Sequence, residues 1–132
     1  MSVTVYRIEH TIPVDKFPHI GMGAYEGLFS EYMEMIRSHP NESHPDIKKD
    51  IGEAEWYKRE PYYEDCYCAC DTLPSLNEWF YGWKEMLLDE GYVVVAYEVT
   101  DVVKTNSMLQ VMFHQELVIS KKIIEDKFGS VI

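Results

Sequence analysis

Residues 92–97 form the longest uninterrupted apolar run of the chain, directly after Gly91. The run is far too short to span a bilayer, which takes a helix of about 20 apolar residues. A short continuous run of valine and aromatic residues is typical of a strand that lies centrally in its sheet. We therefore expect a central strand at 92–99, and the rest of the fold has to be built around it.

Alternating and β-branched segments elsewhere in the chain predict further strands. Residues 3–9 predict the first strand, and residues 64–70 and 109–115 predict two more. Residues 118–124 fit either a last strand or a short helix.

A first helix is expected after a loop that prolines and glycines punctuate. From Tyr25 onward apolar residues recur at steps of three and four, which predicts a helix over 25–38 that ends before Pro40. Gly21 and Gly23 would open this helix. Their amides could bind an anion, but close packing of the chain explains the two glycines equally well.

A second helix is expected at 74–90. It begins with a proline near its first turn and a capping box formed by Ser75 and Glu78. Apolar residues continue at helical spacing, and Gly91 provides a left-handed cap at the end.

The order of these elements favours an α+β fold over a doubly wound sheet, because the strands gather at the end of the chain. We expect residues 1–132 to form one compact domain, with a mainly antiparallel sheet of about five strands and two principal helices. Within it, 39–60 is expected as a long polar loop and 128–132 as a loose tail.

The charge of the chain is concentrated in one segment. The net charge is −11, and residues 60–101 carry ten Asp or Glu against one lysine, Lys84. The same segment is rich in tyrosine and tryptophan. Dense carboxylates repel nucleic-acid phosphates and attract basic protein surfaces, so we expect a basic protein partner and no direct binding of nucleic acid.

The candidate partner-binding residues come from the first part of this acidic segment. Carboxylates would face lysine or arginine of the partner, and exposed tyrosines would act as aromatic anchors. The candidates are Glu60, Tyr62, Tyr63, Glu64, Asp65 and Asp71.

Three cysteines alternate along one predicted strand, at Cys66, Cys68 and Cys70. An odd number of cysteines without a secretory signal indicates free thiols in a reducing cytoplasm. A structural zinc site needs a fourth ligand, which is missing nearby, so we interpret the thiols as small buried apolar groups. The two histidines of 39–45 are likewise assigned to a solvated loop, and no metal is expected.

Five short motifs occur in an order that resembles a family of small, mostly uncharacterised bacteriophage proteins. The resemblance implies a phage origin and expression in a bacterial cytoplasm. In composition such acidic phage proteins resemble inhibitors of host defence, for example anti-CRISPR proteins. The motifs are Tyr6-Arg7-Ile8-Glu9, Gly21-Met-Gly23-Ala-Tyr25, Ser75-Leu-Asn-Glu-Trp79-Phe80, Gly91-Tyr-Val-Val-Val-Ala-Tyr97-Glu-Val and Gln110-Val-Met-Phe113.

A second set of residues resembles ADP-ribosyltransferase-like folds. The resemblance implies that Arg7 orients NAD, that Thr72 and Ser75 follow a cleft strand, and that Gln110 lies in the cleft. The sequence departs from the pattern where a second acid should follow Gln110, and residues 114–116 have the wrong spacing to replace it.

Three functions follow as hypotheses. The first is a phage inhibitor that binds a basic, nucleic-acid-binding host protein and needs no cofactor. The second is a transferase that uses NAD to modify a host protein, with Arg7 and Gln110 as its catalytic residues. The third is a homo-oligomeric interaction module, a dimer for example, whose many aromatic residues form a self-interface. None of them involves a membrane.

Overall fold

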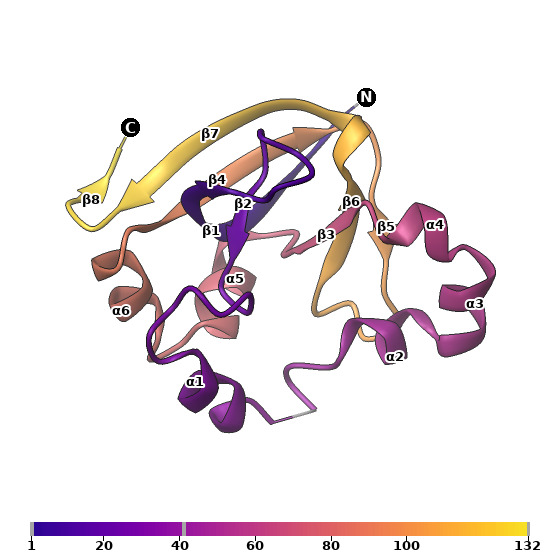
Figure 1. Ribbon diagram of the computed structural model, residues 1–132, viewed down its shortest axis with the longest axis horizontal. Coiled ribbons are helices and arrows are strands. Elements are labelled where there is room, and N and C mark those ends of the chain that lie inside the picture. Colours follow the sequence, from indigo (N-terminus) through magenta and orange to yellow (C-terminus); the bar gives the residue numbers. More distant parts are fainter. Residues whose placement is uncertain (1, 41, 132) are drawn as a thin grey trace.

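The computed structural model describes residues 2–40 and 42–131, which form a single α+β domain (Figure 1). Met1, Asn41 of the expected loop and Ile132 of the expected tail lie outside the described residues. The domain has two antiparallel sheets and a set of short helices. The expected α+β class and the five-stranded antiparallel sheet are therefore confirmed.

The larger sheet pairs its strands in the order β2 (Gly21–Gly23), β1 (Val3–Pro13), β4 (Tyr92–Val99), β7 (Val118–Asp126) and β8 (Gly129–Ser130). The smaller sheet has the order β3 (Cys66–Ala69), β6 (Val111–His114) and β5 (Val103–Lys104). The helices are α1 (Tyr32–Ser38), α2 (Ile47–Ile51), α3 (Glu53–Lys58), α4 (Glu60–Tyr63), α5 (Leu73–Trp79) and α6 (Lys84–Asp89), and a 3-10 turn, η1 (Gln115–Leu117), precedes β7.

The membership of the five-stranded sheet differs from the expectation. The segments expected as strands at 64–70 and 109–115 form β3 and β6 of the smaller sheet, and the short strands β2 and β8 complete the larger one. The two sheets join where Tyr6 and Cys70 exchange backbone hydrogen bonds of 2.8 Å.

The central strand β4 has both of its faces buried. It pairs with β1 on one side and β7 on the other. Tyr92 and Val94 belong to a cluster that includes the helices, whereas Val95 and Tyr97 pack on the opposite face with Phe113 of β6. This explains why the apolar run is continuous and not alternating, and the prediction of a central strand is confirmed.

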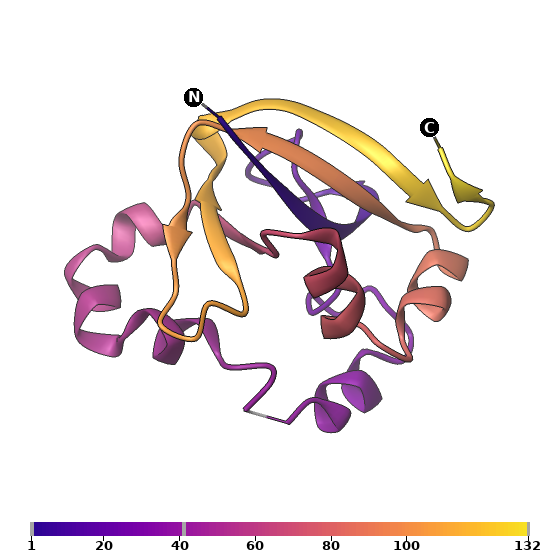
Figure 2. The same cartoon turned by 180° about the vertical axis from the view of Figure 1, so that it is seen from behind.

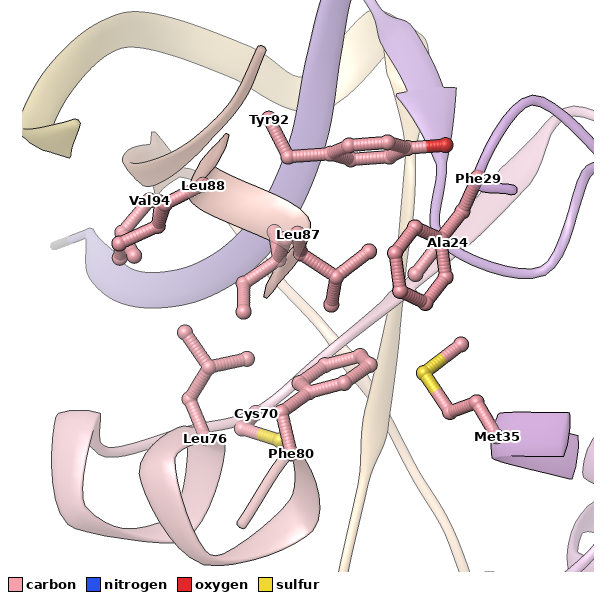
Figure 3. Close-up of a cluster of buried hydrophobic side chains, with 11 residues drawn as sticks. Ala24, Phe29, Met35, Cys70, Leu76, Phe80, Leu87, Leu88, Tyr92 and Val94 are labelled. Atoms are coloured by element: carbon pink, nitrogen blue, oxygen red, sulfur yellow. The ribbon is translucent and has the colours of Figure 1, made fainter. Parts of the chain in front are cut away.

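Helices α5 and α6 lie on one side of the larger sheet with α1 beyond them, while α2, α3 and α4 lie beside the smaller sheet (Figures 1 and 2). In the first cluster Phe29 lies between Tyr92 and Met35, and Leu87 of α6 packs beside it (Figure 3). Phe29, Met35 and Leu87 have no exposed surface. Full burial of each such side chain contributes about 1.5–3 kcal/mol.

The first predicted helix, 25–38, is wrong over its first half. The helix α1 begins at Tyr32, and the preceding residues form turns. Gly27 has a φ of 85°, a left-handed conformation that an α-helix does not accommodate. The carboxylate of Glu26 accepts a hydrogen bond of 2.8 Å from the amide of Gly23, which holds this turn in place.

Gly21 and Gly23 do not open a helix; they form β2. A Cβ at Gly21 would collide with the backbone oxygen of His10 and with the Glu9 carboxylate, and one at Gly23 would lie 3.0 Å from Nη2 of Arg7. Close packing of the chain therefore accounts for both glycines.

The second predicted helix, 74–90, is divided into α5 and α6 at Gly82, which has a φ of 84°. The cap also differs from the prediction, because the hydroxyl of Thr72 accepts from the amide of Ser75 at 3.2 Å. Gly91 ends α6 with a φ of 94°, as predicted.

The segment 39–60, expected as a polar loop, contains α2 and α3. Asp46 caps α2, and the apolar residues Ile47 and Trp56 pack in a cluster with Met112 of β6. The apolar residues of this segment are too few to show helical periodicity in the sequence. The helices depend instead on burial of these residues against the distant strand. The expected loose tail 128–132 likewise contains β8.

Candidate functional site

A cleft with a volume of about 700 Å³ lies between β3, the end of α1, the segment before α2, and α5. The structure brings Arg7 and Gln110 into this cleft, although they are far apart in sequence. Thr72 and Ser75 are not among its lining residues; their hydroxyls bind each other at 2.8 Å at the start of α5. Within residues 114–116, His114 caps η1 by accepting from the amide of Glu116.

Arg7 is 8% exposed and extends from β1. Its Nη1 donates to the backbone oxygen of Cys68 at 3.0 Å and its Nη2 donates to that of Gly21 at 3.1 Å. The guanidinium lies 5.3 Å from the centre of the Tyr67 ring. Among the described residues Nε has no acceptor and no carboxylate forms an ion pair with Arg7. The cleft therefore contains a buried cation without a counterion in the part of the chain that the structure describes.

The amide of Gln110 is already engaged in holding the chain. Its Nε2 donates to the backbone oxygen of Pro45 at 2.9 Å and to Oδ2 of Asp50 at 3.0 Å. Asp50 also accepts from the amide and hydroxyl of Ser107. Burial alone would raise the pKa of Asp50, but these hydrogen bonds lower it below its usual value. The network fixes α2 to the hairpin of β5 and β6.

An aromatic wall, formed by Tyr25, His39, His44 and Trp79, lines another side of the cleft. Trp79 Nε1 donates to the hydroxyl of Tyr25 at 2.7 Å, and this hydroxyl lies 2.9 Å from Nδ1 of His39. His39 and His44 stack with their ring centres 3.8 Å apart. This cluster was missed from the sequence, because its histidines come from a segment with loop-like composition.

The hydrogen bonds of the wall define the protonation of His39. Indole Nε1 can only donate, so the Tyr25 hydroxyl accepts from Trp79. The hydroxyl proton still needs an acceptor, and Nδ1 of His39 is the other partner of this hydroxyl among the described residues, so we assign the proton to the bond with Nδ1. The proton of the neutral imidazole is then on Nε2, which is buried and has no acceptor among the described residues. Burial, together with the neighbouring His44, lowers the pKa of His39 to about 4. His39 is therefore a neutral donor at pH 7.

The three cysteines are free thiols that line the cleft, Cys66 and Cys68 in β3 and Cys70 directly after it. Burial raises the pKa of Cys66 to about 12, of Cys68 to about 11 and of Cys70 to about 12. Thiols with such pKa values stay protonated and are poor nucleophiles and metal ligands. Across residues 2–40 and 42–131, no group of three or more His, Cys, Asp or Glu side chains could hold a metal ion.

The acidic segment faces largely outward. Of its ten acids, Asp65 is the one that forms an ion pair in the described part of the chain, with Lys16 at 2.5 Å. The lysine of the segment, Lys84, pairs with Glu125 of β7 at 2.7 Å. Helices α4 and α6, which belong to the segment, lie at opposite ends of the molecule (Figures 1 and 2). The acids therefore spread over several elements.

The structure separates the candidate partner-binding residues into exposed and buried ones. Glu64 and Asp71 are exposed, and Glu60, Tyr62 and Asp65 are half-buried. Tyr63 is 3% exposed, and its ring stacks on Trp56 of α3 with 5.2 Å between the centres. The expectation that Tyr63 is an exposed anchor is wrong. In the same segment Tyr81 is 86% exposed, next to the turn at Gly82, and the sequence pattern did not distinguish it.

These features define a small α+β protein with an acidic exterior and a cleft around a buried arginine. A family model described as Bacteriophage T4 Y00F protein matches residues 1–126, so the chain belongs to this family of bacteriophage proteins. No curated protein and no solved structure gives a significant match. Within the part of the chain that the structure describes, no helix has the length and apolar character to cross a membrane.

Proposed function

We propose that this phage protein binds a basic, nucleic-acid-binding surface of a host protein and so inhibits a host defence system, as anti-CRISPR proteins do. The observation that carries the proposal is the outward-facing acidic segment 60–101, in which Asp65 alone of the described acids has a cationic partner within the chain. Carboxylates that form no ion pair within the chain present a negative electrostatic potential to a partner. The protein would act in the cytoplasm of the infected bacterium.

The chemistry of such an interface follows from the exposure of its residues. Glu64 and Asp71 would meet lysine or arginine side chains that otherwise contact phosphates. Tyr62 is half-buried against His114 and Arg59, so it would contribute at the edge of the contact. Exposed charges of this kind mainly accelerate the encounter of the two proteins. Where a charge pair is desolvated in the interface, removal of one of its two groups costs about 2–5 kcal/mol of binding free energy.

The test is capture of a purified RNA-guided nuclease complex of the host by the immobilised protein at increasing salt. We expect binding to weaken steeply with salt and to fall at least about tenfold in Glu64→Lys/Asp71→Lys. The matched control is Glu42→Lys/Glu116→Lys, which changes the net charge equally at exposed sites outside the segment. Equal binding of the two double variants, or binding that salt does not affect, would overturn the proposal.

An NAD-dependent transferase is the alternative function, and one observation favours it: Arg7 and Gln110 line the same cleft. The engagement of the Gln110 amide by Pro45 and Asp50 argues against a catalytic role. Incubation with labelled NAD and host lysate tests this alternative. The transferase function requires that a host protein becomes labelled in the presence of the wild type and that no host protein is labelled in the presence of Arg7→Ala.

A homo-oligomeric module remains a further proposal. Its support is reduced because many of the aromatic residues that would form a self-interface are core residues, such as Phe29, Tyr92 and Tyr97. Light scattering during size-exclusion chromatography measures the mass directly, and a monomer of 15.5 kDa would refute this proposal.

A further inference from the structure

The interior of the cleft contains hydrogen-bond donors that have no acceptor among the described residues. Two of the N–H groups of Arg7 donate to backbone oxygens, but Nε has no acceptor in the described residues. A buried cation without a counterion retains a desolvation penalty that no ion pair offsets. The ring of Tyr67 compensates part of this cost. An anionic group in the cleft would offset the remainder.

His39 adds a second donor to the wall of the same cleft. With Nδ1 assigned as the acceptor of the Tyr25 hydroxyl, the Nε2–H group of His39 is left without an acceptor in the described residues. Because its pKa is low, this imidazole adds a neutral donor and not a second positive charge. The interior therefore suits a ligand with acceptor atoms and a single negative charge.

The walls and the rim define the rest of the ligand. Apolar and aromatic side chains, among them Ile36, Trp79 and Phe80, line the walls. The rim carries the exposed carboxylates Glu26, Asp46 and Glu64. These carboxylates repel a ligand with several phosphates, but a single anionic group that passes them reaches the arginine. The volume lies in the range of small-molecule sites, about 300–1,000 Å³.

We propose that the cleft binds a small aromatic monocarboxylate, with the carboxylate at Arg7 and the ring against Trp79 and Phe80. The Arg7 Nε atom is closed off from solvent, so we expect its side chain to shift when the ligand enters. The proposal does not rest on the docking function, which depends on the acidic exterior. Glu64 lines the cleft and also belongs to the proposed docking surface, so the variants that test the cleft leave it unchanged.

The experiment is a titration of the full-length protein followed by amide proton–nitrogen NMR. The probes are phenylacetate, phenethylamine with the same ring and a positive charge, and phenyl phosphate with a more highly charged group. We expect phenylacetate to shift the signals of cleft residues such as Ala24 and Ala69. It should bind at least about tenfold more tightly than phenethylamine, because the charge-assisted hydrogen bonds to Arg7 are absent in the amine complex. Phenyl phosphate should bind more weakly than phenylacetate.

Two variants locate the site. Arg7→Met should abolish the preference for phenylacetate, with the amide spectrum showing that the variant is folded. Ile36→Trp should narrow the cleft without removing a hydrogen bond, and Met33→Trp is its matched control on α1. Ile36 and Met33 are 42% and 45% exposed, and Met33 does not line the cleft.

Three results would overturn the proposal: shifts scattered over the surface, equal affinity for the acid and the amine, or equal phenylacetate binding by Ile36→Trp and Met33→Trp. Capture of the host protein by these cleft variants should stay unchanged. Failure of the cleft proposal is therefore distinguishable from failure of the docking proposal.

Discussion

Two buried charges on β1, Glu9 and Arg7, lie two residues apart and have opposite surroundings. Glu9 has no exposed surface, and its carboxylate accepts from the amide of Gly21, the hydroxyl of Tyr97 and, at 3.3 Å, Nζ of Lys121. Arg7 has two carbonyl acceptors and no counterion in the described chain. The comparison separates a charge that the fold uses for its own stability from one whose balance is left to a ligand.

The Glu9 network connects elements that the sequence keeps far apart. Through one carboxylate, β2 is held beside β1, Tyr97 of β4 is satisfied, and Lys121 of β7 gains an ion pair. Removal of the carboxylate would break this connection at the edge of the larger sheet, which β2 forms. We therefore expect the stability of the protein to depend far more on Glu9 than on Arg7.

The largest expected effect is that of Glu9→Ala. Removal of the carboxylate leaves the amide of Gly21 without this acceptor and the buried hydroxyl of Tyr97 with the distant backbone oxygen of His19, at 3.5 Å. We expect a loss of about 3–5 kcal/mol in the free energy of unfolding. Chemical denaturation measures it, with Glu98→Ala on β4, whose carboxylate accepts from an exposed serine, as the control. A loss below about 1 kcal/mol would show that the stability of the fold does not depend on the Glu9 carboxylate.

A smaller effect is expected for Gly21→Ala, which leaves every charged group in place. The added Cβ would collide with the Glu9 carboxylate and the His10 backbone, and such overpacking costs about 1–3 kcal/mol. Gly27→Ala is the control, because a Cβ there meets no atom within 4 Å and its strain comes from the φ of 85° alone. Thermal unfolding should rank Gly21→Ala below Gly27→Ala; the reverse order would contradict the packing argument.

A third prediction concerns His39, whose buried Nε2 also has no partner among the described residues. Its pKa is about 4 in the folded protein and about 6.5 in the unfolded chain. Below pH 6.5 the unfolded chain therefore takes up a proton that the folded protein does not. The free energy of unfolding should be unaffected by this group above that pH and fall as the pH decreases toward 4.

Because His39 is partly exposed, the effect of pH on it is reduced. We expect its protonation in the unfolded chain to lower the free energy of unfolding by about 1–2 kcal/mol. Comparison of wild type and His39→Gln by denaturant titration between pH 7 and pH 4 isolates it, because other acids titrate in both proteins. Identical pH dependence of the two would show that His39 is not a desolvated donor.

The central parts of the fold could be predicted from sequence because their signals are local. The apolar run of β4 and the alternation of β1 depend on neighbouring residues alone. The helix bounds could not be predicted, since an isolated glycine in a helical pattern is compatible with a continuous helix, whereas Gly27 and Gly82 adopt positive φ values. The helix α3 depends on burial of Trp56 against a distant strand.

The site could be predicted to a smaller extent. Resemblance pointed to Arg7 and Gln110, and the fold does bring them to one cleft, but their roles depend on carbonyl and carboxylate partners that lie far away in sequence. The wall of Tyr25 and His39 was missed, because its hydrogen bonds form between a turn and a polar segment. The burial of Tyr63 was missed for the same reason: its partner belongs to α3.

The smallest stability effect, and the sharpest test of the comparison, is expected for Arg7→Met. The substitution leaves two carbonyl oxygens without a donor, which destabilises the fold, but it also removes a buried charge without a counterion, which stabilises it. The two contributions oppose each other, so we expect a net change within about 1 kcal/mol, compared with the several kcal/mol of Glu9→Ala. Denaturation of both variants in one buffer provides the comparison. If Arg7→Met destabilised the protein as much as Glu9→Ala, Arg7 would be a structural residue like Glu9, and its missing counterion would no longer indicate a ligand.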